Sequence, residues 1–227
     1  MQKRLFVLLL ISIAFIRADA QAPTGKPVII EIVAKSSAFK FSAFADMKGY
    51  GIENIQQWNN RVIVYASTAY PQQLKDRIIK EYPADQVILF ENPFYNFNRK
   101  YCSDKTVAKQ WDNIILSANL VKDPKLQQEY LNCHATQFQK WPEVSQGFCN
   151  ANFQQLLVFK TGRQLMLVIS IPKGESLDKL NPLTSKNNPR VDDWNNMMKK
   201  YQEGIEGTKK GEVWVFFKEV DNKKFIE

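Results

Sequence analysis

The chain of 227 residues contains a single histidine, His134, and only three cysteines. The spacing of Cys102, Cys133 and Cys149 matches no familiar zinc-binding pattern. A metal site formed by Cys133, His134 and Cys149 is a weak alternative, so we expect no metal centre. One disulfide would leave one thiol unpaired, and the sequence leaves all three pairings open.

The sequence also lacks an apolar run long enough to cross a bilayer. Residues 5–16 form an apolar run of about 12 residues, whereas a spanning helix needs roughly 20. This run follows a basic start and precedes Ala18-Asp19-Ala20, as in a secretory signal peptide with its cleavage site. We expect a signal peptide over 1–20, a mature chain that begins at Gln21, and a periplasmic or secreted protein without a stable membrane anchor. An uncleaved anchor is the alternative.

A concentrated basic patch is missing, although the formal net charge is +8. The lysines are scattered, and the pairs at 199–200, 209–210 and 223–224 are typical of solvated surface. Nucleic-acid binding requires basic side chains gathered on one face, preferably among aromatic ones. We therefore expect no nucleic-acid partner. Haem and flavin motifs are absent as well.

What is present is an internal repeat. Similar blocks start at Gly49 and Gly147, and an Asn–apolar–Gln–Gln tetrapeptide follows at the same offset in each, at 54–57 and 152–155. Each block then passes through a turn into a second apolar segment. This pattern is typical of a β-hairpin.

The flanking segments extend the repeat to two complete units. In the first half the expected elements are a strand over 28–34, a segment ending near Met47 that is compatible with a helix, the hairpin, a helix over 71–82 and a strand over 87–90. In the second half they are a strand over 113–121, a helix after Asp123-Pro124, a hairpin over 153–171, a helix after Asn188-Pro189 and a strand over 212–220.

The order strand–helix–strand–strand–helix–strand, taken twice, predicts an α+β protein made of tandem ferredoxin-like repeats. Helices cover one face of each sheet, and two sheets packed face to face cover the other. We expect an N-terminal half over 21–101 as structural partner, a polar junction over 98–110 and a C-terminal half over 111–227. The result is an intrachain, pseudo-dimeric α/β barrel that does not require a homodimer.

The single histidine falls on the first helix of the second half. Its helical row consists of Leu126, Tyr130, His134 and Phe138. Side chains four residues apart project from one helix face, so Tyr130 and His134 lie together. The block Trp141-Pro142-Glu143 follows. The next helix carries an apolar row of Val191, Trp194, Met198, Tyr201 and Ile205.

These residues resemble the L-rhamnose mutarotases, small proteins of the dimeric α/β-barrel superfamily, over about residues 113–220. Tyr130 and His134 match a tyrosine and a histidine on that family's first helix. Residues 141–143 match its Trp-Pro-Glu block, and Trp194 and Met198 match part of its second helix. The interval from the histidine to the tryptophan is longer here, Asn195 replaces a second tryptophan, and 174–188 looks like an insertion.

The resemblance implies an isomerase of the aldose 1-epimerase type that interconverts the α and β anomers of L-rhamnose or a related monosaccharide without a cofactor. Such a reaction needs one group that takes a proton and one that gives it, and a histidine with its ordinary pKa of about 6.5 suits this task. His134 and Tyr130 are the expected catalytic residues, and Trp194, Glu143 and Trp141 the expected substrate-binding residues.

Each of these residues also has an ordinary structural interpretation. His134 alone would be a polar residue on a helix, and Tyr130 and Trp194 would be core aromatics. Two other functions therefore stay open. One is a non-catalytic carbohydrate-binding protein of the same barrel fold, and the other is a barrel relative with unrelated redox or small-molecule chemistry.

Overall fold

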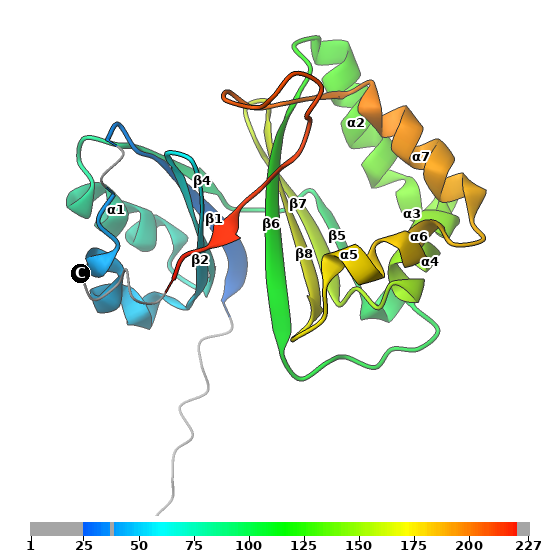
Figure 1. The fold of residues 1–227 in the computed structure, drawn as a ribbon, viewed down its shortest axis with the longest axis horizontal. Coiled ribbons are helices and arrows are strands. Elements are labelled where there is room, and N and C mark those ends of the chain that lie inside the picture. Colours follow the sequence, from blue (N-terminus) through cyan, green and yellow to red (C-terminus); the bar gives the residue numbers. More distant parts are fainter. Residues whose placement is uncertain (1–24, 37–38, 222–227) are drawn as a thin grey trace, which may run out of the picture.

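The computed structural model describes residues 25–36 and 39–221. The expected signal peptide lies outside the described residues. Two curled antiparallel sheets stand face to face, and helices cover the outer face of each (Figure 1). In the described part of the chain, no helix combines the length and the apolar character that crossing a membrane requires.

The first sheet and its helices come almost wholly from the first half of the chain. Its elements are β1 (Lys26–Val33), the 3₁₀ helix η1 (Ser42–Tyr50), β2 (Ile52–Trp58), β3 (Arg61–Thr68), α1 (Pro71–Glu81) and β4 (Gln86–Phe90). The strand order β4-β1-β3-β2 is that of a ferredoxin-like unit, and all pairs are antiparallel. The segment ending near Met47 is thus helical, as a 3₁₀ helix.

The second half repeats this topology with more helices. Its elements are β6 (Trp111–Leu120), α2 (Pro124–Ala135), α3 (Gln137–Lys140), α4 (Pro142–Asn150), β7 (Gln155–Thr161), β8 (Gln164–Pro172), α5 (Leu177–Leu180), α6 (Pro182–Ser185), α7 (Pro189–Lys199), β9 (Gln202–Glu203) and β10 (Val215–Phe216). The order β10-β6-β8-β7 is again ferredoxin-like, and β9 also pairs with β6. The predicted fold class is confirmed.

Each half also contributes a strand to the sheet of the other. β5 (Tyr95–Asn98) follows β4 in the chain but pairs with β7 of the second sheet. β11 (Lys218–Glu219) follows β10 but pairs with β2 of the first sheet. Sheet membership therefore crosses the division of the chain at the junction near residue 101. This reciprocal exchange ties the two halves together.

The space between the sheets is filled by inward-facing side chains of both. The buried cluster there consists of Ile29, Ile63, Tyr65, Phe90, Ile115, Leu157, Phe159, Met166, Val168, Ile205, Val215 and Phe217. Both halves contribute, because successive residues of a strand point to opposite faces and each sheet has an apolar inner face. Beside this cluster, the partly buried Arg61 donates to the buried carboxyl group of Glu31 at 2.8 Å.

The first helix of the second half is shorter than expected. It ends at Ala135, and Phe138 lies on the separate helix α3. The Thr136 hydroxyl donates to the Asn132 carbonyl at 3.0 Å, a local bond of the kind that bends or ends helices. Pro142 then starts α4, since proline is favoured at the first helical position.

The sequence repeat holds for the order of elements and not for individual residues. The pairs that flank the hairpin turns are Trp58 with Arg61 and Thr161 with Gln164. This register places Gln56 in correspondence with Phe159, and not with Gln154 as the tetrapeptides suggested. The strand expected over 212–220 is also divided into β10 and β11, because the chain crosses between the sheets there.

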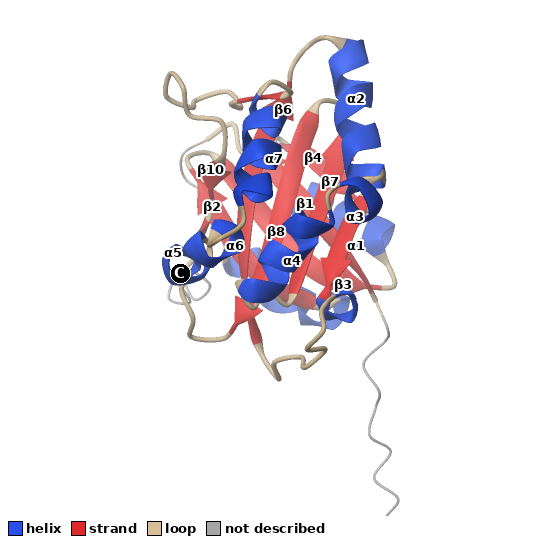
Figure 2. Cartoon of the chain, turned by 90° about the vertical axis from the view of Figure 1, so that its right-hand side faces the viewer, coloured by secondary structure: helices blue, strands red, loops and turns tan. Residues whose placement is uncertain are grey.

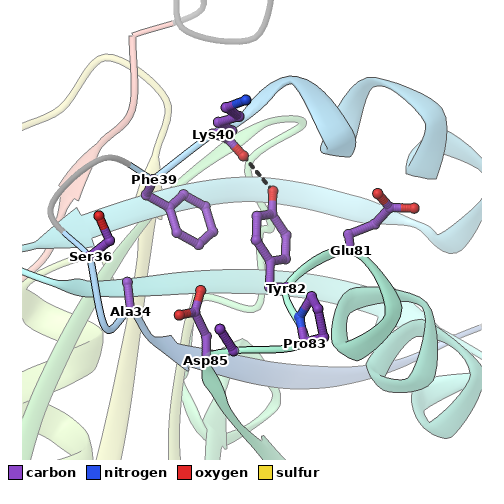
Figure 3. Close-up of a pocket in the computed structure, with 9 residues that line it drawn as sticks. Ala34, Ser36, Phe39, Lys40, Glu81, Tyr82, Pro83 and Asp85 are labelled. Atoms are coloured by element: carbon purple, nitrogen blue, oxygen red, sulfur yellow. Dashed lines mark hydrogen bonds between the residues drawn. The ribbon is translucent and has the colours of Figure 1, made fainter.

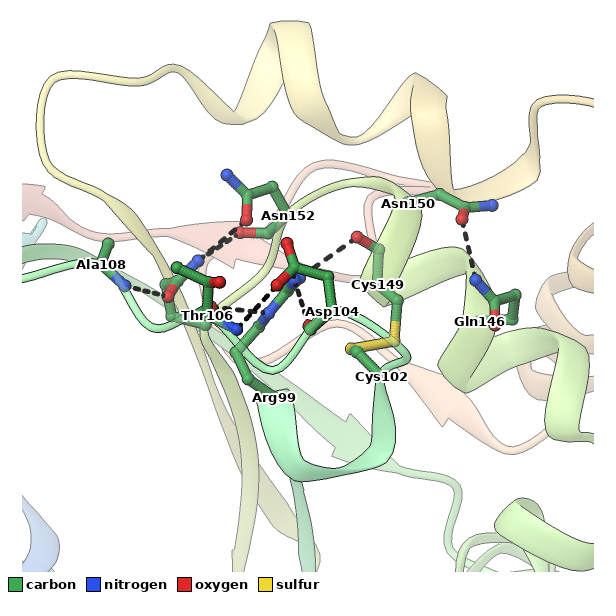
Figure 4. Close-up of polar contacts among 10 residues, drawn as sticks. Arg99, Cys102, Asp104, Thr106, Ala108, Gln146, Cys149, Asn150 and Asn152 are labelled. Atoms are coloured by element: carbon green, nitrogen blue, oxygen red, sulfur yellow. Dashed lines mark hydrogen bonds and ion pairs between the residues drawn. A yellow bond between two sulfur atoms is a disulfide. The ribbon is translucent and has the colours of Figure 1, made fainter.

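The junction between the halves is an ordered turn (Figure 4). The buried Arg99 guanidinium donates to the carbonyls of Asp104, Thr106 and Cys149. Beside it, a disulfide joins Cys102 to Cys149 on α4, so Cys133 is the free cysteine. These contacts hold the crossing segment against the helix layer of the second half.

Candidate active site

A cavity of about 330 Å³ lies between the second sheet and its helices. Figure 2 shows α2, α4 and α7 layered over the strands of this sheet. β7 and β8 supply an apolar floor. The other lining residues that matter for the chemistry are Tyr130, His134, Trp194, Met198, Gln202 and Trp214.

His134 presents one ring nitrogen as a proton acceptor. Its Nδ1 lies 3.0 Å from the backbone carbonyl of Tyr130, one helical turn earlier. A carbonyl oxygen only accepts, so Nδ1 carries the proton and the neutral ring has its lone pair on Nε2. The side chain is 8% exposed, and burial lowers the pKa of His134 to about 4. At neutral pH it is therefore an uncharged base.

Aromatic rings hold the imidazole in place. The ring centroid of His134 is 4.3 Å from that of Tyr130, 5.2 Å from Trp194, 5.3 Å from Tyr95 and 5.7 Å from Phe94. Tyr95 lies on β5, the strand that the first half contributes, and its hydroxyl donates to Gln137 at 2.6 Å. The first half therefore builds part of the wall behind the histidine.

Tyr130 provides a hydroxyl that remains protonated. The side chain is 1% exposed, and burial raises the pKa of Tyr130 far above its ordinary value of 10. Its oxygen accepts a hydrogen bond of 3.3 Å from Gln202, whose own carbonyl accepts one of 3.2 Å from Trp214. Sequence reasoning missed Gln202 and Trp214, because neither belongs to a motif and only the folded chain brings them to α2.

The expected substrate-binding residues fall in different places. Trp194 lines the cavity. Trp141 lies behind it, with ring centroids 5.7 Å apart and the Arg190 guanidinium 4.0 Å above its ring. Glu143 forms an ion pair of 3.7 Å with Arg190 and does not line the cavity. The structure thus brings Tyr130, His134 and Trp194 together, and their roles stay predictions.

The weak metal alternative meets a chemical obstacle. Cys149 is bonded to Cys102 and has no thiolate to offer as a ligand. Cys133 lies on α2 beside Tyr201, with its sulfur 3.9 Å from the hydroxyl. Among residues 25–36 and 39–221, no three His, Cys, Asp or Glu side chains are grouped in a way that could hold a metal ion.

The first half has a smaller hollow without comparable chemistry. It measures about 250 Å³ and lies where Phe39 and Lys40 meet the end of α1 (Figure 3). The Tyr82 hydroxyl there donates to the Lys40 carbonyl at 2.5 Å. The rings of Phe39 and Tyr82 are stacked, with their centroids 4.4 Å apart. This tyrosine proton is bound within the protein, and the hollow is lined by the carboxyl groups of Glu81 and Asp85 and by no histidine.

The fold and the site define a class, the pseudo-dimeric α/β barrel with one His–Tyr cavity under the helices of its second half. The L-rhamnose mutarotase family model matches residues 103–221, more than half of the chain. The chain belongs to the L-rhamnose mutarotase family. The resemblance predicted from residues 113–220 is confirmed.

Other comparisons are more distant. A putative monooxygenase from Fusobacterium nucleatum is 9% identical, with a TM-score of 0.45, and the match covers 86% of this chain and 92% of that one. A heme-degrading enzyme from Listeria monocytogenes is 13% identical, with a TM-score of 0.39 and coverage of 85% and 99%. Such distant similarities say nothing about activity. No curated protein matches the chain.

Proposed function

We propose that the protein is an exported mutarotase that interconverts the α and β anomers of L-rhamnose or a related monosaccharide. Membership of the family supports a sugar mutarotase in general terms. The observation that carries the finer proposal is the pairing of a neutral His134 Nε2 with the protonated Tyr130 hydroxyl at one cavity.

In the proposed reaction, His134 Nε2 takes the proton of the anomeric hydroxyl while Tyr130 gives its proton to the ring oxygen. The bond between C1 and the ring oxygen breaks, and an aldehyde forms. After rotation about the C1–C2 bond, the newly formed hydroxyl attacks the other face of the aldehyde. It returns its proton to Tyr130, and protonated His134 returns the other to the anomeric oxygen. No electrons are gained or lost, so the chemistry requires no cofactor.

The dimensions and lining of the cavity suit a single sugar ring. Its volume of about 330 Å³ falls in the usual range of about 300–1,000 Å³ for small-molecule sites. Trp194 offers an aromatic surface for the C–H face of a pyranose, and Leu167 and Ile169 offer an apolar surface for the methyl group of a 6-deoxy sugar. The disulfide between Cys102 and Cys149 supports export, because such bonds persist in oxidising compartments.

Magnetisation-transfer NMR on several reducing sugars tests this proposal. L-Rhamnose, L-fucose, D-galactose and D-glucose are incubated separately with the protein, and anomer exchange is compared with the spontaneous rate. We expect catalysed exchange that is fastest for L-rhamnose or another 6-deoxy sugar. Binding of a sugar without faster exchange would instead support the non-catalytic alternative.

A further inference from the structure

Two side chains from the end of the second half form a hydrogen-bond chain that ends on Tyr130. The indole nitrogen of Trp214 lies 3.2 Å from Oε1 of Gln202, and Nε2 of Gln202 lies 3.3 Å from the Tyr130 hydroxyl. A tryptophan N–H can only donate, so the end of the amide that faces Trp214 must be its carbonyl. The NH₂ group of Gln202 therefore faces Tyr130, and this orientation is fixed by chemistry.

The direction of these two hydrogen bonds determines where the proton of Tyr130 can point. Because the phenol oxygen accepts from Gln202, its own hydrogen must lie along another direction. Among the described residues, Gln202 is the hydrogen-bond partner of this hydroxyl. Tyr130, His134 and Gln202 all line one cavity, so the O–H bond is available to a ligand there. One donor and one acceptor, His134 Nε2, then face the same ligand.

The backbone holds Gln202 independently of the helix that carries Tyr130. Gln202 lies on β9 opposite Leu120 of β6, and the amide of Val121 donates to the carbonyl of neighbouring Tyr201 at 2.9 Å. A side chain on a short, paired strand keeps its position better than one on a free loop. This placement suits a residue whose task is to orient another.

We propose that Gln202, oriented by Trp214, is a positioning residue that fixes Tyr130 as the proton donor to the ring oxygen of the sugar. The inference rests on the proposed mutarotase function and extends it to residues outside the motifs of the second half. Gln202 does not exchange a proton itself. It prevents the Tyr130 hydroxyl from turning its hydrogen away from the substrate.

Gln202→Glu tests the direction of the bond. A carboxylate only accepts, so at pH 8 it accepts from both Trp214 and Tyr130 and turns the phenol proton away from the cavity. We expect kcat for anomer exchange to fall about 10-fold with KM little changed, the scale of one misdirected hydrogen-bond donor. As the pH falls and the carboxyl group takes up a proton, it can donate to Tyr130 again, and kcat rises toward the wild-type value.

The wild-type protein provides the contrasting profile. Because burial lowers the pKa of His134 to about 4, the ring stays neutral between pH 5 and pH 8. We therefore expect the kcat of the wild-type protein to be constant over this range. Gln128→Glu is the matched control, because Gln128 is exposed on α2 and the charge change is the same. This control should show the wild-type rate and profile. Gln202→Met, which cannot donate, should lose about threefold without recovery at low pH.

A double substitution separates positioning from a general structural role. If Gln202 acts only through Tyr130, Gln202→Glu has no further effect on kcat once Tyr130 is Phe. Additive losses would overturn the proposal, as would a flat pH profile for Gln202→Glu at the wild-type rate. Should Gln202→Glu fail to fold, as judged by circular dichroism, Gln202→Met decides, and a wild-type kcat there contradicts the inference.

The parent proposal fails on different evidence. If Tyr130→Phe and His134→Ala both exchange anomers at the wild-type rate, the proposed reaction is wrong. If both lose exchange while Gln202→Glu keeps it at every pH, only the positioning role of Gln202 is wrong.

Discussion

The two halves share one topology and differ in what lies over the sheet. In the first half, the 3₁₀ helix η1 and α1 pack closely on the sheet, and an aromatic group fills the space between them: Phe39, Phe41, Phe44 and Tyr82. In the second half, six helices cover the sheet and leave a cavity with a histidine in its wall. A repeated fold therefore does not imply a repeated site.

The half without the site nevertheless helps to build it. Its strand β5 crosses to the second sheet, and Tyr95 on that strand contacts the ring of His134. Its sheet also covers the inner face of the second sheet. The first half thus covers the second sheet and contributes a strand to it, while its own hollow is smaller and contains no histidine.

The largest effect should come from separating the halves. A fragment that begins at residue 111 exposes the apolar inner face of its sheet and lacks both β5 and Cys102. We expect it to be insoluble or to self-associate, because large exposed apolar faces drive association. Size-exclusion chromatography with light scattering measures this. A soluble monomeric fragment with a cooperative unfolding transition would contradict the dependence of one half on the other.

The next largest effect concerns the residue that has no counterpart in the first half. His134→Ala should slow anomer exchange by about 10²-fold or more, the usual scale of a positioned base. His134→Gln, which keeps the size of the side chain but not the base, should be equally slow. NMR exchange measures both variants, and Asn132→Ala, exposed on the same helix, is the control. Wild-type exchange in His134→Ala would remove the histidine from the mechanism.

A matched pair of tyrosine substitutions compares the halves directly. Tyr130→Phe should lower kcat about 10-fold, the scale of one lost hydrogen-bond donor, and should also lower the free energy of unfolding by about 1 kcal/mol, because the hydroxyl accepts a bond from Gln202. Tyr82→Phe should leave kcat unchanged and lower the free energy of unfolding by about 1 kcal/mol, because its hydroxyl bonds the Lys40 carbonyl. Urea unfolding and exchange rates are measured on both. Equal effects on activity would mean that the two tyrosines are not functionally distinct.

The last comparison concerns the sign of the pH dependence of stability in each half. His134 has its pKa lowered from 6.5 to about 4, so the unfolded chain takes up its proton first as the pH falls. Wild-type stability relative to His134→Gln should decrease between pH 6.5 and pH 4, by roughly 3 kcal/mol at about 1.4 kcal/mol per pKa unit.

Glu31 in the first half acts in the opposite direction. Burial raises the pKa of Glu31 above 4.5, against the effect of Arg61. Its contribution to stability is complete below pH 4.5 and is lost as the pH rises through the folded pKa. Wild-type stability relative to Glu31→Gln should therefore decrease as the pH rises. Urea unfolding series from pH 4 to pH 7 measure both differences in stability. If both differences change in the same direction with pH, one of the two pKa shifts has the opposite sign to the one expected.

Local patterns predicted most of the architecture. Apolar runs with turn residues gave the hairpins, and Asp123-Pro124 and Asn188-Pro189 marked the starts of α2 and α7. The division of the first long helix at Thr136 was missed, because a side-chain bond to Asn132 ends it. The register of the repeat was also missed, because short polar matches do not report which residues pair across a turn.

The sequence likewise predicted some features of the candidate site and missed others. The spacing of Tyr130 and His134 placed them on one helix face, since that relation depends only on helix geometry. Glu143 was expected to bind the substrate because it matches the family's Trp-Pro-Glu block, and in the structure it forms an ion pair with Arg190.

The sequence by itself determined the repeated order of elements, the family resemblance and the His–Tyr pair. All three depend on contacts within a few residues or on patterns along the chain. Only the tertiary structure decided the strand exchange, the disulfide partner of Cys149 and the hydrogen bond from Gln202 to Tyr130. These features depend on groups far apart in the chain, such as Tyr130 and Gln202. Such groups come together only when the two sheets and the helix layer pack and bury their apolar surface. No local pattern records that approach, because the free energy of burial is shared by the whole core.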